Sequence, residues 1–317
     1  MPATRPGATG AVISGWGTAL PEKVITNEEL AATMETSDEW IRTRTGIHER
    51  RVGGSTAGLS ADAGRQALEM AGLTPDRIDA LILATTTPDK QWGTASLIQN
   101  ELGLRCGAIE VNAACTGFMY GLVQAHGMIA MGADRVLVIG TDTLSRITDW
   151  DDRGTAPLFA DGSGAVVLEA VEGAGQLLAW DLDADGSLLP ILWAEVGGTI
   201  QMEGKEVFRR AVRLMVDSAE KAMAAAGVTA DDIALIVPHQ ANIRIIQAAC
   251  DRLGVPIERA ASTIHRTGNT SSASIPLALA DALDAGRVQN GDLVLLVGFG
   301  GGMTAGSCVL RWGGDAE

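Results

Sequence analysis

The chain has 317 residues, 46% hydrophobic and 20% charged, so it can bury a large core and is not predicted to be disordered. Its formal net charge of −15 argues against nucleic acid as a main partner, because such partners require a basic surface. The four cysteines lack CxxC spacing and only four histidines are present, which predicts no metal site and no disulfide framework and favours a cytoplasmic location.

Hydrophobic periodicity along the chain predicts alternating helices and buried strands. The runs "ALILATTT", "VLVIG", "LIVPH" and "LVLLVGFGGG" are typical of strands covered on both faces. We therefore expect an α/β architecture in which helices cover sheets. Helices are predicted near 27–35, 56–71, 95–102, 116–131, 205–226, 241–253 and 272–285.

The uncharged stretch from Val111 to Ala133 is long enough to be considered as a membrane span. Asn112, Gln124 and His126 interrupt it, and a Cys-Thr-Gly turn divides it. These features favour a buried strand followed by a buried helix, so no membrane association is expected.

Three segments recur in the same order along the chain. The segment 67–83 resembles 222–237, 132–140 resembles 290–298, and 162–170 resembles 304–312. Any α/β protein repeats helix-turn-strand units, but the shared order favours a duplication. We place the boundary near 171–178, which divides the chain into residues 1–174 and 175–317.

Cys115 in "EVNAACTGFMYG" lies where a predicted strand meets a predicted helix. Unpaired N–H groups and the helix dipole at that point would stabilise a thiolate, and a backbone N–H could hold an oxyanion. The alternative is a small buried hydrophobic residue, which is the common role of a free cysteine.

Three further features follow predicted strands. His239 in "VPHQANIRII" comes directly after a buried strand, and Asn269 lies in the Gly- and Ser-rich loop "STIHRTGNTSSASIP". A structural histidine and a turn or N-cap asparagine are the alternatives. The run "GFGGGMTAGS" would let backbone approach a ligand closely, but its spacing does not match a dinucleotide motif. Together with Cys115, these features indicate acyl-thioester chemistry.

The sequence closely resembles the β-ketoacyl-ACP synthase III family of the thiolase superfamily, the condensing enzymes that start fatty acid synthesis. The resemblance covers nearly the whole chain and is carried by "TSDEWIRTRTGIHERR", "AACTGF", "DRGTAPLFADGSGA", "PHQANIRI", "HRTGNTSSASIP" and "GFGGGMTAGS". It implies a duplicated, five-layered αβαβα thiolase-like fold.

The resemblance also implies catalytic roles. Cys115 would take the acyl group from acyl-CoA, while His239 and Asn269 would hydrogen-bond the thioester carbonyl of malonyl-ACP and stabilise the enolate formed as carbon dioxide leaves. The N–H groups of Cys115 and Gly301 would form the oxyanion hole. No cofactor is implied, because the CoA thioester is itself a substrate.

Substrate contacts are implied in the same way. Trp40, Arg44 and Arg153 match residues that hold the CoA adenine and phosphate, and Asn242 matches one that contacts the pantetheine arm. The acyl pocket would include Trp92, which typically reaches across a homodimer into the neighbour's pocket, together with Phe299 and Met303.

The acidic acyl carrier protein needs positive charge at its docking surface. Arg209 and Arg213 lie four residues apart on one predicted helix, and Arg244 and Arg252 could join them. Arg209 and Arg244 are the better candidates on the resemblance, and an ordinary solvated helix face is the alternative.

Competing functions within the superfamily differ in the residues they need. A polyketide starter-unit synthase or an acyltransferase of the same family shares the cysteine and histidine and is the main alternative. A non-catalytic partner subunit tends to lack the nucleophile, and a degradative thiolase would need a second cysteine near the glycine loop, which has none.

Overall fold

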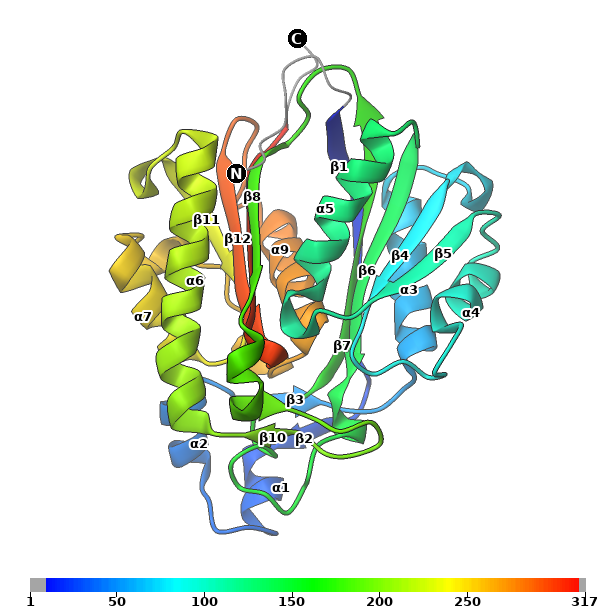
Figure 1. The fold of residues 1–317 in the computed structure, drawn as a ribbon. Helices are drawn as coiled ribbons and strands as arrows, with labels where there is room; N and C mark the ends of the chain where they lie inside the picture. The colour runs from blue at the N-terminus through cyan, green and yellow to red at the C-terminus, as the bar shows by residue number, and fades with distance from the viewer. Residues whose placement is uncertain (1–9, 314–317) are drawn as a thin grey trace.

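Two large β-sheets, two small two-stranded sheets and three layers of helices make up the fold in the computed structural model, which describes residues 10–313 (Figure 1). The helices are α1 Asn27–Ala31, α2 Asp38–Thr45, α3 Thr56–Met70, α4 Thr94–Glu101, α5 Gly117–Ala130, α6 Gly204–Ala226, α7 Ile243–Leu253, α8 Ile264–Thr267 and α9 Ser274–Asp284. The strands are β1 Gly10–Ala19, β2 Val24–Thr26, β3 Glu49–Arg51, β4 Ala80–Ala84, β5 Gly107–Val111, β6 Arg135–Thr143, β7 Asp161–Val171, β8 Leu177–Ala184, β9 Leu192–Trp193, β10 Gln201–Met202, β11 Ile233–Pro238, β12 Leu293–Gly300 and β13 Thr304–Arg311.

The two large sheets have matching topologies. The first has the order β1-β7-β6-β4-β5 and the second the order β8-β13-β12-β11, with the same parallel and antiparallel pairings at corresponding positions. A parallel bridge from Ile236 to Ala260 stands where β5 pairs with β4 in the first sheet. The chain passes from one sheet to the other through residues 172–176, within the predicted boundary region.

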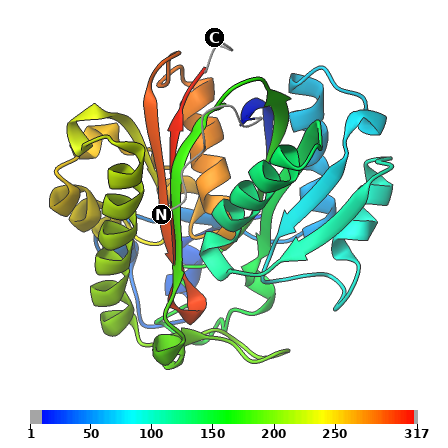
Figure 2. The ribbon, with the colours of Figure 1, turned by 45° about the horizontal axis from the view of Figure 1, so that its top comes forward.

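Helices cover both faces of each sheet, which gives the αβαβα layering expected from the resemblance. Figures 1 and 2 show α5 and α9 enclosed between the sheets, α3 and α4 outside the first sheet, and α6 and α7 outside the second. Separate hydrophobic clusters fill the two outer interfaces, and one continuous cluster joins both sheets to α5 and α9. The central helices are therefore largely buried, as their mostly apolar sequences require.

The uncharged stretch from Val111 to Ala133 forms the end of β5, a short 3-10 turn and α5. Phe118, Met119 and Leu122 on α5 are all fully buried in the central cluster. The predicted strand and buried helix are therefore confirmed. Within residues 10–313, we find no helix whose length and apolar character would let it cross a membrane.

Most predicted helices agree with the structure to within two residues at each end, but the first does not. The helix predicted at 27–35 ends at Ala31, and a second helix, α2, was not predicted. Its signals were present: the Ser37 hydroxyl accepts from the Trp40 N–H at 3.1 Å, and Gly46 ends the helix with φ of 80°. This short helix places Trp40 and Arg44 on the surface between the two halves.

A buried carboxylate ties the two halves together. Asp142, at the end of β6, is fully buried. One of its oxygens accepts from the Thr86 N–H at 2.7 Å and from the hydroxyls of Thr85, Thr86 and Thr87, all in the loop after β4. The other oxygen accepts from the Ser272 N–H at 3.1 Å and from the Ser272 hydroxyl, in the C-terminal half. The carboxylate thus fixes the turn before α9 against the first sheet.

We predict that Asp142→Ala lowers the free energy of unfolding by at least about 3 kcal/mol, because several buried donors lose their acceptor and each unpaired group costs about 1–3 kcal/mol. Asp142→Asn should have a smaller effect, since it keeps one acceptor oxygen. Urea unfolding monitored by circular dichroism measures both. A loss below about 1 kcal/mol in the alanine variant would show that the loops hold each other without the carboxylate.

Candidate active site

One cavity of about 1240 Å³ lies between the two halves and contains most of the predicted site residues. Among the described residues that line it, five are basic and one, Glu195, is acidic. The basic residues are Arg44, Arg146, Arg153, Lys205 and Arg244. A protein with a formal charge of −15 therefore has a positively charged cavity, which suits an anionic ligand.

Cys115 lies in the 3-10 turn Ala114–Thr116, directly before α5. Ala114 adopts a left-handed conformation with φ of 47°, which brings the following residue sharply round toward the cavity. Burial raises the pKa of the Cys115 thiol to about 12, while the Ser271 hydroxyl and the N–H groups of Cys115 and Gly301 lower it. The predicted donors are present, but burial outweighs them, so the resting side chain is a thiol at neutral pH and not the expected thiolate.

The glycine-rich turn after β12 lies against Cys115. A Cβ atom at Gly300 would lie 2.7 Å from the Cys115 backbone nitrogen, so only glycine permits this approach. The approach allows the Gly301 N–H and the Cys115 N–H to face the same sulfur. Two backbone donors thus converge on one point of the cavity wall, the arrangement that an oxyanion requires.

His239 follows β11 and is 1% exposed, although it contributes to the cavity wall. Its ring Nδ1 lies 2.6 Å from the Ser274 hydroxyl oxygen, and the ring packs edge-on against Phe299 with centroids 5.5 Å apart. Burial lowers the pKa of His239 to about 3, so the imidazole is neutral at physiological pH. The histidine can therefore act as a neutral hydrogen-bond donor or acceptor.

Asn269 enters the cavity from the loop before α9. Its backbone N–H donates to the Leu158 carbonyl and its carbonyl accepts from the Ala160 N–H, both at 2.9 Å. The side-chain oxygen accepts from the Ser271 N–H at 2.9 Å. Because the oxygen is engaged in this way, the NH₂ group is the end of the amide that remains to donate to a ligand.

Strained backbone is concentrated at this site. Among the described residues, the non-glycine residues with positive φ are Ala114, Ser271 and Met303. Ala114 precedes the cysteine, Ser271 hydrogen-bonds it, and Met303 lies in the glycine-rich turn. Such conformations cost roughly 1–3 kcal/mol each and persist where the surroundings hold them.

The predicted CoA-binding residues line the mouth of the cavity. The Arg153 guanidinium carbon lies 4.3 Å from the Trp40 ring centroid, and that of Arg44 lies 5.9 Å from it. Asn242 caps α7, where its side-chain oxygen accepts from the Arg244 N–H at 2.9 Å. An indole face with two guanidinium groups is a suitable surface for a purine and its phosphates.

The predicted acyl-pocket residues do not all lie on the cavity wall. Phe299 lines it, whereas Met303 is fully buried in the hydrophobic cluster beneath α6 and does not reach it. Trp92 is 84% exposed and is not part of this chain's own cavity, although its neighbour Gln91 is.

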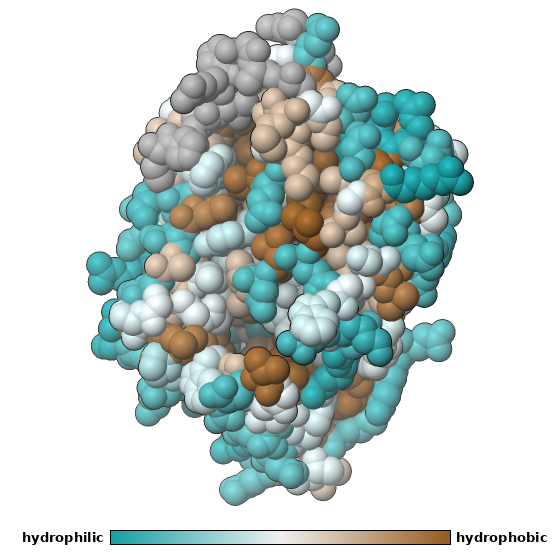
Figure 3. Space-filling model, turned by 45° about the vertical axis from the view of Figure 1, so that its right-hand side comes forward, coloured by the Kyte–Doolittle hydropathy of each residue, from teal (hydrophilic) through white to brown (hydrophobic). Residues whose placement is uncertain are grey.

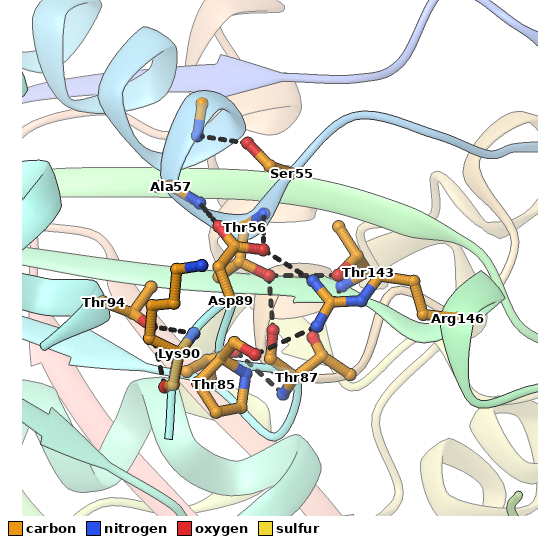
Figure 4. Close-up of polar contacts among 12 residues, drawn as sticks. Ser55, Thr56, Ala57, Thr85, Thr87, Asp89, Lys90, Thr94, Thr143 and Arg146 are labelled. Atoms are coloured by element: carbon orange, nitrogen blue, oxygen red, sulfur yellow. Dashed lines mark hydrogen bonds and ion pairs between the residues drawn. The ribbon is translucent and has the colours of Figure 1, made fainter. Parts of the chain in front are cut away.

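The loop that carries Trp92 is anchored by Asp89. The Asp89 carboxylate accepts from the N–H groups of Thr56 and Ala57 at the start of α3 and pairs with Arg146 at 2.6 Å (Figure 4). Arg146 also donates to the Pro88 carbonyl. The loop is thus held at the N-terminus of α3. Arg146, the ion-pair partner of Asp89, is part of the cavity wall.

Several site residues were not predicted from the sequence. Ser271 and Ser274 support the cysteine and the histidine, and Lys205 and Phe208 of α6 line the cavity. The serine-rich run "NTSSASIP" indicates only a loop and an N-cap. Nothing in a single sequence distinguishes a serine that caps a helix from one that bonds a catalytic ring.

Comparisons with known proteins agree with this geometry. The family model described as 3-oxoacyl-(acyl-carrier-protein) synthase III matches residues 109–186, and the C-terminal model of the same description matches residues 223–312. A β-ketoacyl-(acyl-carrier-protein) synthase III from Sinorhizobium medicae is 49% identical and covers 95% of this chain and 99% of its own length.

Solved structures give the same result. The 3-oxoacyl-(acyl-carrier-protein) synthase III of Aquifex aeolicus superimposes with a TM-score of 0.93 at 44% identity, over 96% of this chain and all of the other. A priming β-ketosynthase from a polyketide biosynthetic pathway has a TM-score of 0.92 at 34% identity, over 97% of this chain and 98% of its own.

Proposed function

The chain belongs to the 3-oxoacyl-(acyl-carrier-protein) synthase III family, and we propose that Cys115, His239 and Asn269 carry out its condensation reaction. The protein is an acyltransferase of the condensing type. It joins a short acyl-CoA primer to malonyl-ACP with release of CoA and carbon dioxide, the step that starts fatty acid synthesis.

In the first half-reaction, the Cys115 sulfur attacks the thioester carbonyl of acyl-CoA. The tetrahedral intermediate carries negative charge on oxygen, which the N–H groups of Cys115 and Gly301 would stabilise. Its collapse breaks the carbon–sulfur bond to CoA, and CoA leaves with the proton that the cysteine thiol gave up. The buried thiol is thereby converted into a neutral thioester, which no longer opposes burial.

In the second half-reaction, the malonyl thioester carbonyl accepts hydrogen bonds from His239 and the Asn269 NH₂ group. The bond to the malonyl carboxylate breaks, carbon dioxide leaves, and the electron pair forms an enolate on that carbonyl. The enolate carbon then attacks the acyl-Cys115 carbonyl, and the Cys115 sulfur leaves as a thiolate, which takes up one proton from the solvent and so becomes a thiol again. Two neutral donors in a buried site stabilise the developing charge without a counter-ion.

The observation that carries this proposal is the convergence of the cysteine, two backbone N–H groups, a neutral histidine and an asparagine amide on one cavity. The proposed chemistry requires no metal and no organic cofactor. A cytoplasmic location remains a prediction, which the four free cysteines support.

We predict that acyl-CoA adds one acyl group to the wild-type chain and none to Cys115→Ser, as measured by intact mass, because the serine hydroxyl is a far weaker nucleophile. Malonyl-ACP should then discharge the acyl-enzyme as β-ketoacyl-ACP, with release of carbon dioxide. A panel of acyl-CoAs would identify the primer. Acylation of the serine variant at the wild-type rate, or the absence of acylation by every primer, would contradict the proposed role of Cys115.

Carrier-protein docking is proposed at the start of α6 and α7, with Arg244 as its main cation. Glu206 accepts from Arg209 with both oxygens, at 2.8 and 2.7 Å, and from Arg210 at 2.8 Å. Arg213 pairs with Asp217, whereas Arg244 lies over the Phe208 ring and forms no ion pair with the described residues. Arg252 lies near the far end of α7, away from the cavity. The geometry therefore supports Arg244 over the other predicted arginines.

We predict that Arg244→Ala raises the KM for malonyl-ACP about ten-fold, the effect of losing one charge-assisted contact. Acylation of Cys115 by acyl-CoA should be unchanged. Steady-state kinetics with malonyl-ACP and with malonyl-CoA separate the two effects, since only the former requires protein docking.

Glu206→Gln provides the matched control, because it releases Arg209 and Arg210 without removing a cation. It should lower the KM for malonyl-ACP, and the change should shrink at high salt. An equal effect of either variant on malonyl-CoA would place the defect in the cavity and not at a docking surface.

A homodimer is proposed through the edge of the first sheet. β5 ends that sheet, and Ile109 on β5 and Leu97 on α4 are each 40% exposed. Figure 3 shows hydrophobic residues at the surface on the side of the molecule where these elements lie. Antiparallel pairing of β5 with its two-fold copy would cover the unpaired edge and these side chains. Trp92, which is exposed in the loop directly before α4, would then be available to the neighbouring chain.

We predict that Ile109→Asp shifts the wild-type dimer to a monomer in sedimentation velocity, because the charge would be buried without a partner. Glu220→Gln, an exposed change on α6 outside the second sheet, should leave the assembly unchanged. A wild-type monomer, or an aspartate variant that remains dimeric at micromolar concentration, would place the interface elsewhere.

Priming of a polyketide and transfer to another acceptor, the alternatives considered from the sequence, have less support. The synthase III proteins of Sinorhizobium medicae and Aquifex aeolicus are 49% and 44% identical to this chain, whereas the priming β-ketosynthase of a polyketide pathway is 34% identical. No feature of the described cavity favours a second function.

A further inference from the structure

We propose that Ser274 is a positioning residue that holds His239 in the tautomer with its proton on Nε2, the nitrogen directed at the substrate. This inference rests on the proposed function, because it explains how a neutral histidine can present a donor to the malonyl carbonyl. Ser274 does not touch the substrate in this scheme and acts only through the ring.

The contact between the Ser274 and His239 side chains is short and shielded from solvent. The Ser274 oxygen lies 2.6 Å from Nδ1 of His239, and both residues are 1% exposed. Water therefore cannot compete for either group. Among the described residues, Ser274 is the one hydrogen-bond partner of this ring.

The direction of the hydrogen bond follows from a second contact of the serine. The backbone N–H of Gln240 lies 3.4 Å from the Ser274 oxygen and can only donate to it. The serine oxygen is an acceptor on that side, and among the described residues Nδ1 of His239 is the one acceptor within hydrogen-bond distance of the buried hydroxyl, so we assign the hydroxyl hydrogen to it. A ring nitrogen that accepts a hydrogen bond carries no proton. The single proton of the neutral imidazole is therefore on Nε2.

The neighbouring Gln240 holds this arrangement in place. Gln240 is fully buried, and its side-chain oxygen accepts from the N–H groups of Thr263 and Ile264 at 3.0 and 3.2 Å. Its amide nitrogen donates to the carbonyls of Pro238 and Ala261. With every side-chain group paired, Gln240 fixes the chain directly after His239, and so fixes the distance to Ser274.

The other side of the contact is fixed by the first sheet. Ser274 is the first residue of α9, directly after the short turn Ser271–Ala273. Ser272 in that turn donates hydrogen bonds from its N–H and its hydroxyl to the Asp142 carboxylate. The serine and the histidine therefore approach each other from two rigid elements, so their contact does not depend on a flexible side chain.

Nuclear magnetic resonance of the wild-type protein tests the tautomer without any assumption about catalysis. The chain has four histidines, so long-range ¹H–¹⁵N spectra of ¹⁵N-histidine-labelled protein are simple, and loss of one signal set in His239→Ala gives the assignment. We expect a protonated Nε2 and an unprotonated Nδ1 for His239. A protonated Nδ1 in the folded wild-type protein would overturn the proposal.

Kinetics of a Ser274→Ala variant test the consequence of this tautomer for decarboxylation. Without the serine hydroxyl, both tautomers become accessible, and release of carbon dioxide from malonyl-ACP should fall about ten-fold, as for one lost buried hydrogen bond. Acylation of Cys115 by acyl-CoA should persist, and Ser274→Thr, which keeps the hydroxyl, should recover more of the decarboxylation rate than alanine. Unchanged decarboxylation in the alanine variant, or equal loss in both half-reactions, would contradict a positioning role.

Ser218→Ala is the matched control for removal of a buried hydroxyl. Ser218 on α6 is also 1% exposed, and its hydroxyl has no hydrogen-bond partner among the described residues. Its removal should change neither rate. His239→Ala separates the two proposals: normal decarboxylation in that variant would reject the proposed role of His239, whereas a protonated Nδ1 with an inactive His239→Ala would reject only the role of Ser274.

Discussion

The alignment of the site depends on the buried carboxylate of Asp142. The proposed nucleophile, Cys115, comes from one half of the molecule, and His239 and Asn269 come from the other. A rigid junction must therefore hold them in register. Asp142 provides it, since its two oxygens bind the loop after β4 and the turn before α9. Because this carboxylate receives donors from both halves, it meets the requirement that a buried charge be fully hydrogen-bonded.

Burial dominates the electrostatics at Cys115 and His239, and it favours the uncharged form of both side chains. The pKa of Cys115 is raised and that of His239 is lowered for the same reason. Neither side chain therefore brings a charge into the inner cavity, where the N–H groups of Cys115 and Gly301 face the sulfur of Cys115. The basic side chains lie along the route to the solvent, where they can attract an anionic carrier.

Sequence patterns predict the layers well, and they single out Cys115, His239 and Asn269, which meet at one cavity, because these features depend on local signals. Buried strands, the uncharged central helix and the Cys115 turn each follow from periodicity and turn residues. Helix α2 was not predicted although Ser37 and Gly46 mark its ends, since its few apolar residues show no clear period. The hydrogen bonds from Ser271 to Cys115 and between Ser274 and His239 were not predictable, and neither was the full burial of Met303. They depend on segments that are distant in the chain and meet only after folding.

The stack of Arg153 on Trp40 has a consequence for how ligands exchange. A flat base that settles on this indole must first displace the guanidinium, so it gains only the difference between two similar stacking free energies. The guanidinium and a base therefore compete for one face of the indole, and Arg153 sets the net gain from stacking there.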